Sequence, residues 1–231
     1  MELKNCVGVL IIFLSILKCG FFQSNQIIYN APCRRHDPHL NQCLTKAFIN
    51  ARKSFASGEW LDGIQMRPMD PFNLQNHTFG GDTFFKIITE NMTVNGLSNY
   101  IVEKYNVNLK DLSADIVLFY PKFADTAIYS GNINLIGVNF RGSFRSYYRN
   151  TRVFLHFEAE KYIKEGREYL RLVDVTLSSN KIFHALRSSH QVHNIVIPII
   201  YPYIERTYAE IIREEMNKMA DLIPYDMLLP E

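Results

Sequence analysis

The pattern of apolar positions changes twice along the chain. After a potential helix start at Asp37 and Pro38, apolar side chains recur every three or four residues until Gly58, which is typical of an amphipathic helix. From 64 to about 187 they alternate with polar ones, as in strands with one apolar and one polar face. Helical spacing returns over 192–222. The sequence therefore predicts an α+β fold, with an antiparallel sheet between two helices.

The alternation is clearest in the middle of the chain. Ile116, Leu118 and Tyr120 share one face of a predicted strand, and Asp115 lies on the other. The same pattern sets further apolar residues against polar neighbours: Tyr129, Ile133, Leu135, Val153, Leu155, Phe157, Val173, Val175 and Leu177.

Four pairs of residues are compatible with hairpin turns: Asn95-Gly96, Ser130-Gly131, Arg141-Gly142 and Glu165-Gly166. Gly131 could equally mark a bulge.

One predicted strand, over 83–93, does not alternate cleanly. Lys86 and Glu90 point to one face, whereas Asn91 of a glycosylation sequon would point to the other. Either a bulge intervenes or Asn91 carries no glycan.

The last helix has a broad apolar stripe and an opposite polar side. Pro198 and Pro202 cannot both sit inside a regular helix, so the helix is kinked there or starts after them. The stripe contains Ile204, Tyr208, Ile211, Ile212, Met216, Met219 and Ile223, and the polar side contains Glu205, Arg206, Glu210, Arg213, Glu214 and Lys218.

A sheet with one apolar face and only two helices is most stable when it curls around the longer helix. Where large side chains fail to interdigitate, a lengthwise cavity for a long hydrophobic molecule is expected. The residues predicted to line this cavity, each of which could equally belong to the packed core, are Phe85, Leu118, Tyr129, Ile133, Phe157, Val173, Ile204, Tyr208 and Ile211.

The first residues indicate secretion. Residues 1–22 are predicted to form a signal peptide, with a short cationic end and an apolar stretch too short to span a membrane; cleavage is expected between 19 and 24, and a retained membrane anchor is the alternative. Residues 23–231 then form a single domain. Cys33 and Cys43 are the only thiols left, so a disulfide is expected, with a metal site as the alternative. Sequons at Asn76 and Asn91 agree with secretion.

Composition and motifs exclude several classes of function. The net charge of +2 argues against a nucleic-acid partner. The chain has no G-x-S-x-G, H-E-x-x-H or G-x-G-x-x-G motif, so no enzyme and no cofactor is expected, although residues of a convergent triad need not be close in sequence.

Three groups of polar residues have a plain structural interpretation beside a functional one. The first group is His184, His190 and His193, which we interpret as solvated or structural histidines, with a metal site or a pH-sensitive latch as the alternatives. The second is Arg141, Arg145, Arg149 and Arg152, which we place on a solvated outer face, with contact with an anionic surface as the alternative. Glu158 and Glu160 are interpreted as solvent-facing acids and not as a glycosidase pair.

Several motifs resemble, in order and spacing, those of the takeout and juvenile-hormone-binding protein family of insects. They are Cys33 and Cys43 around Asp37-Pro38-His39-Leu40-Asn41, Met69-Asp70-Pro71-Phe72, Val94-Asn95-Gly96-Leu97-Ser98, Tyr129-Ser130-Gly131 with Gly137 and Gly142, Tyr169-Leu170, and Ile223-Pro224-Tyr225-Asp226-Met227-Leu228.

The resemblance covers essentially all of the mature chain. It implies an elongated wrap of curved sheet around a long helix, similar to one module of the tubular lipid-binding superfamily, with small hydrophobic ligands in an internal tunnel. A second cysteine pair is absent, so the chain looks more like the takeout branch, and juvenile hormone is in doubt as ligand. Where the family often has Asn-x-x-Trp before the last helix, this chain has Asn194-Ile195-Val196-Ile197.

The sequence thus predicts a secreted, monomeric carrier of a small hydrophobic ligand such as a terpenoid hormone or fatty acid. Contact with a membrane or receptor for delivery is a further expectation. The alternatives are a secreted interaction or signalling protein with a packed interior, and a lipid-modifying enzyme.

Overall fold

The computed structural model describes residues 33–61, 64–74, 76–81, 85–134, 137–180, 183–188 and 193–231. The predicted signal peptide lies outside them. In chain order the elements are α2 (Leu40–Asn50), α3 (Arg52–Ser57), β1 (Glu59–Leu61), β2 (Ile64–Gln65), β3 (Phe72–Leu74), β4 (His77–Gly81), β5 (Phe85–Asn95), β6 (Ile101–Asn108), β7 (Ser113–Ile133), β8 (Val138–Lys164), β9 (Arg167–Ser179), β10 (Phe183–Ser188), α4 (His193–Ala220) and α5 (Tyr225–Leu228).

The first helical region begins later than its sequence predicts. Asp37 accepts a hydrogen bond from the backbone N–H of His39 at 2.7 Å, so it caps a turn, and α2 starts only at Leu40. The predicted end is confirmed, because α3 stops at Gly58 with a φ of 78°. A Cβ at Gly58 would lie 2.4 Å from the carbonyl oxygen of Met66, so the close approach of that segment also requires glycine.

The main sheet contains eight strands in the described part of the chain, and all its pairings are antiparallel. The long central strands β7 and β8 pair from Ser113 opposite Glu158 to Ile133 opposite Val138. β6 and β5 share the other edge of β7, and β9 and β10 share the other edge of β8. β3 and β4 in turn share the outer edge of β5.

This topology corrects three of the four predicted hairpin turns. Asn95-Gly96 ends β5, but β5 and β6 both pair with β7 and not with each other. Ser130-Gly131 and Arg141-Gly142 lie inside the β7–β8 ladder, where the register is unbroken, so Gly131 is not a bulge either. A Cβ there would lie 2.5 Å from the carbonyl oxygen of Lys86 in β5. Glu165-Gly166 does connect β8 to β9 as predicted.

A bulge in β5 resolves the irregular pattern around Asn91. The pairing of β5 with β7 shifts register between Glu90 and Thr93, and Asn91 has a φ of 50°. The extra residue turns Asn91 outward, because the buried positions move from Ile87 and Thr89 to Met92 and Val94. The bulge alternative is therefore correct, and Asn91 is exposed.

A second bulge makes the prediction for Val173 wrong. The pairing of β8 with β9 shifts register between Glu158 and Ala159, and Val173 is the unpaired residue of β9. Leu172 and Val175 on either side are buried, whereas Val173 is 41% exposed. Val173 cannot line an interior cavity.

Both central strands change their inward face near Pro121. In β7 the even-numbered residues up to Tyr120 are buried, Pro121 and Lys122 are exposed, and burial resumes on odd-numbered residues such as Asp125. β8 makes the same change at Asn150, which has a φ of 50°. The β7–β8 register is maintained across the change, so both strands turn over together.

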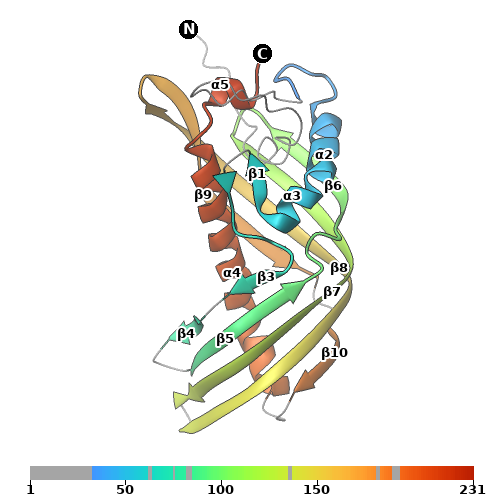
Figure 1. Ribbon diagram of the computed structural model, residues 1–231, viewed down its shortest axis with the longest axis vertical. Coiled ribbons are helices and arrows are strands. Elements are labelled where there is room, and N and C mark those ends of the chain that lie inside the picture. The colour runs from blue at the N-terminus through green and yellow to red at the C-terminus, as the bar shows by residue number, and fades with distance from the viewer. Residues whose placement is uncertain are drawn as a thin grey trace.

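The sheet curves around α4, as predicted. Figure 1 shows α4 running along the long axis of the molecule. Asn217 of α4 makes two hydrogen bonds to the backbone of Leu172 in β9, at 2.8 and 3.0 Å. Thr207 of α4 contacts His77 of β4 at 3.1 Å. Because β9 and β4 lie on opposite sides of the central strands, the sheet must bend to bring both to one helix.

α4 begins before both prolines, so of the two alternatives that the sequence left open, a kinked helix or a later start, the later start is excluded. In the described residues, no helix is long and apolar enough to cross a membrane.

The two ends of the described chain are joined. Cys33 and Cys43 form the predicted disulfide, which ties the N-terminal arm to α2. Arg35 donates to the carbonyl oxygen of Leu229 through Nε at 3.3 Å and Nη2 at 3.0 Å. Its guanidinium also lies 4.7 Å from the ring centre of Tyr225 in α5.

Candidate functional site

A cavity lies between the inner face of the sheet and α4. It leaves about 170 Å³ open to the centre of a water-sized sphere, well above the roughly 10–15 Å³ that one water needs by the same measure. Its apolar walls come from α2 and α3, the segment after β2, β5 and the segment after it, the central strands, β9 and α4. They are Phe48, Phe55, Met66, Met69, Val94, Leu97, Leu118, Tyr120, Phe123, Tyr148, Val153, Leu155, Phe157, Leu177, Ile204, Tyr208, Ile212, Met216 and Met219.

The cavity lies between two apolar clusters. One contains α2, β6 and the first half of β7, and includes Leu44 and Ile116. The other contains β3, β4, β5 and the second half of β7, and includes Phe72 and Ile87. Phe123, which follows the turnover at Pro121, packs against both. The cavity is therefore at the junction, where the sheet turns over.

Aromatic rings form part of the wall at this junction. Phe123 stacks on Tyr148 with ring centres 4.3 Å apart and an angle of 6° between the planes. Tyr120 meets Phe123 edge to face at 5.5 Å. Burial raises the pKa of the Tyr120 hydroxyl, so this phenol stays neutral. The wall offers large apolar surfaces with few polar atoms, as in sites for apolar small molecules.

Asp125 is the most deeply buried carboxyl group of the wall. It follows the turnover in β7 and is 6% exposed. Its Oδ2 accepts a hydrogen bond from the Tyr148 hydroxyl at 3.0 Å, and Ser146, directly opposite on β8, also donates to this carboxyl. Burial raises the pKa of this carboxyl to about 6, with the neighbouring Ser146 and Tyr148 acting in the opposite direction.

α4 brings two more carboxyl groups to the cavity. Glu205 was predicted on the polar side of the helix, but it lines the cavity and accepts a hydrogen bond from Ser179 at 2.9 Å. Glu215, 8% exposed, accepts from Lys218 Nζ at 2.6 Å and from the backbone N–H of Arg67 at 3.4 Å. Arg67 also lines the cavity and is exposed.

The structure places four of the nine predicted lining residues at the cavity, namely Leu118, Phe157, Ile204 and Tyr208. Four others, Phe85, Tyr129, Ile133 and Ile211, belong to the second apolar cluster and are not among the lining residues. Val173 is on the outside. Sequence reasoning missed α2 and α3, although the apolar spacing of Phe48 and Phe55 already placed both on the buried side of that helix.

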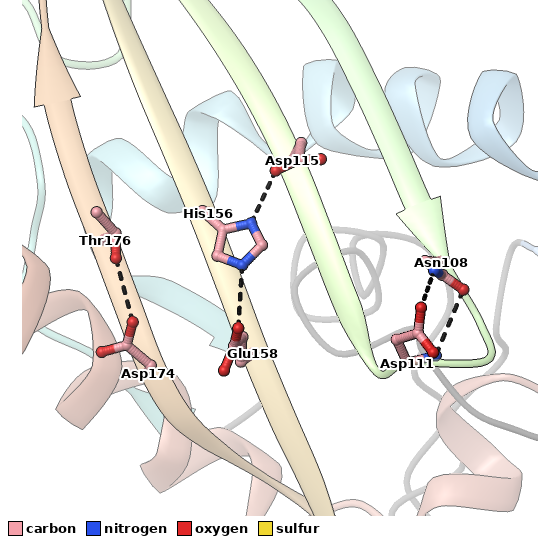
Figure 2. Close-up of polar contacts among 7 residues, drawn as sticks. All are labelled: Asn108, Asp111, Asp115, His156, Glu158, Asp174 and Thr176. Carbon is pink, nitrogen blue, oxygen red and sulfur yellow. Dashed lines mark hydrogen bonds and ion pairs between the residues drawn. The ribbon is translucent and has the colours of Figure 1, made fainter.

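The polar groups on the outer face of β8 interact with one another. Figure 2 shows His156 on the outer face of β8, with Nδ1 2.8 Å from Asp115 and Nε2 3.4 Å from Glu158. The hydrogen bond to Asp115 raises the pKa of His156, and Glu158 adds to this, against a smaller lowering by burial. Glu158 and Glu160 are exposed, as predicted. In the part of the chain that the structure describes, no cluster of His, Cys, Asp or Glu fits a metal ion.

The arginines of β8 lie on the same solvated face. Arg141, Arg145, Arg149 and Arg152 are all exposed, and Arg141 and Arg152 pair with Glu90 at 3.1 Å and Glu103 at 2.7 Å. This is the solvated outer face that the sequence favoured. His190 lies outside the described residues, as do the side chains of His184 and His193.

Comparison with known proteins places the chain in a family. The model of the haemolymph juvenile hormone binding protein family matches residues 9–183. The chain belongs to this family. The crystal structure of Takeout 1 from Epiphyas postvittana is 13% identical, and the match covers 87% of this chain and all of that one with a TM-score of 0.59, which shows a shared fold. A match to lipopolysaccharide binding protein, at 9% identity over 67% of this chain and 34% of that one, has a TM-score of only 0.30. No curated protein matches in sequence.

The motifs that resemble this family contact one another in the structure. The Asp70 carboxylate accepts hydrogen bonds from the backbone N–H groups of Gly96 and Ser98 at 2.8 and 2.9 Å, which joins two motifs that lie far apart in sequence. At the other end, Asp226 pairs with Arg167 at 3.2 Å. These hydrogen-bonded residues hold the framework, while Met69, Val94 and Leu97 of the same motifs line the cavity.

Proposed function

We propose that this protein is a secreted carrier that binds a small apolar ligand in the cavity between its sheet and α4. The supporting observation is the cavity itself, a space enclosed by apolar side chains in a fold that has a substantial packed core on both sides of it. Family membership supports the same function. The alternative of a surface-acting protein with a filled interior gains no support from this geometry.

Affinity in such a site comes from burying the apolar surface of the ligand. Each Å² removed from water contributes about 25 cal/mol, from which the cost of association is subtracted. No covalent step is needed. We propose that a continuous tunnel carries the ligand in and out, and that a membrane or receptor receives it.

The test is ligand extraction from protein made in insect cells, followed by mass spectrometry and binding of the neutral apolar probe phenylnaphthylamine. We expect a co-purified apolar molecule and saturable probe binding. Met216→Trp would fill the cavity and should weaken probe binding by about tenfold or more. Leu222→Trp, at a site that is 45% exposed, is the control and should bind as the parent does. A protein that yields no lipid and binds no probe would refute the carrier function.

Secretion can be tested separately through the sequons. Asn76 and Asn91 are both exposed and both have a positive φ, of 43° and 50°. We propose that both carry glycans. Enzymatic deglycosylation should increase gel mobility, and Asn76→Gln and Asn91→Gln should each remove one step of that change. Medium that contains no glycosylated product would contradict this proposal.

A further inference from the structure

Exposed cations gather on the outer face of the sheet beyond the turnover at Pro121. Arg141, Arg145 and Arg149 of β8 are all exposed and lie four residues apart, so they follow one face of the strand at intervals of about 13 Å. Lys122 of β7 is exposed and lies directly opposite Arg149. Figure 1 shows this part of the sheet at the lower end of the molecule, where β5, β7 and β8 lie side by side.

Acidic groups offset only part of this positive charge. Glu90 of β5 pairs with Arg141 at 3.1 Å. In the described part of the chain, neither Lys122 nor Arg145 forms an ion pair. Like charges that lie directly opposite on neighbouring strands repel each other, as Lys122 and Arg149 do here. An anion that contacts this face would remove that repulsion.

The other half of the outer face has a different character. Before the turnover, the exposed outer positions of β7 and β8 include the acids Asp115, Glu158 and Glu160. An anionic surface is repelled by these acids and attracted by the cations beyond Pro121. The distribution of charge therefore orients the molecule toward such a surface with its lower end.

Apolar side chains are exposed between the cations. Tyr147, 37% exposed, lies between Arg145 and Arg149 on the outer side of β8. Ile128 of β7, 42% exposed, lies opposite Ser143 and so beside the same row of arginines. Proteins that adsorb to lipid combine these two features, because basic side chains attract anionic headgroups and apolar or aromatic side chains enter the interface.

We propose that this cationic face docks the protein on a membrane surface that contains anionic lipids. The cationic face consists of Lys122, Ile128, Arg141, Arg145, Tyr147 and Arg149. Lipid headgroups are mobile and reach each cation whatever its spacing, whereas an acidic protein would need carboxylates at matching intervals. The face is solvated in the free protein and is covered only on contact. The inference rests on the proposed carrier function, since it names the surface at which ligand is delivered, but docking itself is measurable without ligand.

The test is sedimentation of the delipidated protein with two kinds of vesicle. One kind contains phosphatidylcholine alone, and the other contains equal parts of phosphatidylcholine and phosphatidylserine. We expect binding to the anionic vesicles that is at least about tenfold stronger than binding to the neutral ones. Added salt should weaken this binding, because it screens the attraction between exposed charges.

A pair of double variants separates the cationic face from net charge. Lys122→Ala combined with Arg145→Ala should weaken binding to the anionic vesicles about tenfold or more, because each cation near such a surface contributes roughly a factor of five. Lys104→Ala combined with Lys110→Ala is the matched control, since it removes the same charge from exposed positions of β6 and the turn after it. The control should bind nearly as the parent does.

A third variant tests the apolar part of the face. Ile128→Ser combined with Tyr147→Ser keeps every charge and should weaken binding to the anionic vesicles severalfold. If this variant binds as the parent does, the proposed insertion of apolar side chains is refuted.

The outcomes keep this inference apart from the carrier function. Equal binding to the two kinds of vesicle, binding to neither, or equal losses in the two charge variants refutes docking by the cationic face. Phenylnaphthylamine binding by the same preparation then decides the carrier function on its own. If the anionic vesicles are bound as expected but the probe is not, the cationic face stands and the carrier function fails.

Discussion

Replacing Asp125 by Asn should change how the stability of the protein depends on pH. Burial raises the pKa of this carboxyl from 3.8 to about 6 in the folded protein. The folded state therefore holds a proton between these pH values that the unfolded state has released. Stability from this group is complete below pH 3.8, falls as the pH rises, and is lost above about pH 6.

The size of the effect follows from the change in pKa. Each pKa unit corresponds to about 1.4 kcal/mol, so the ionised carboxyl destabilises the folded protein by about 3 kcal/mol at neutral pH. Asn has the same shape and never ionises. The free energy of unfolding of Asp125→Asn, relative to the parent, should therefore rise by about 2 kcal/mol between about pH 4 and about pH 7.5, less than the full amount because the unfolded carboxyl is already partly ionised at pH 4.

Urea unfolding of delipidated protein, followed by circular dichroism at both pH values, measures this difference. Taking the difference between variant and parent cancels the titration of all other groups. Asp174→Asn is the control, since Asp174 is exposed and accepts a hydrogen bond from Thr176 at 3.1 Å. Its difference from the parent should be nearly the same at both pH values. A difference for Asp125→Asn that does not change with pH would refute the reasoning.

Three further predictions concern the framework, and urea unfolding tests each. Leu44→Ala, at a site with no exposed surface, should lower the free energy of unfolding by about 2–5 kcal/mol, whereas Ile49→Ala, 38% exposed, should cost far less. Gly58→Ala should be clearly more destabilising than Gly137→Ala, because both have a positive φ but only Gly58 would place a Cβ against backbone. His156→Gln should cost more stability near pH 6 than near pH 8.5. The pKa of His156 is raised in the folded protein, so its protonated ring stabilises the fold at low pH, and this stabilisation is lost as the pH rises through the folded pKa. If the two losses of stability in one of these comparisons are equal, the prediction that it tests is contradicted.

Periodicity predicted the fold because burial on one face leaves a regular trace in the sequence. The alternation around Ile116 and Tyr129 placed both residues inward, and both are buried. Alternation alone does not, however, reveal the register between neighbouring strands. Val173, Val175 and Leu177 alternate as a regular strand would, yet Val173 is the extra residue of a bulge. Only the pairing with β8 decides which of the three faces solvent.

One acidic residue of the cavity, Glu205, could have been placed from the sequence. Glu205 lies seven residues before Ile212 and eleven before Met216, close to two and three full turns of an α-helix. Glu205 therefore lies on the same face of the helix as these two residues. Its charge alone caused the prediction that it lies on the polar side. The position of Asp125 could not be found in this way, because it depends on the turnover at Pro121 and on the partner strand.

The turnover at Pro121 accounts for a cavity in a fold that is otherwise well packed. Before it, Leu118 and Tyr120 point inward from even positions, and after it Phe123 and Asp125 do so from odd positions. Inward residues of a regular strand are two positions apart, and this spacing is interrupted between Tyr120 and Phe123. The inward side chains of the two halves of the strand therefore point in different directions. Each half fills its own cluster, and the junction stays open against α4. Because the clusters supply the burial that holds the fold, the junction can keep a buried carboxyl that costs stability.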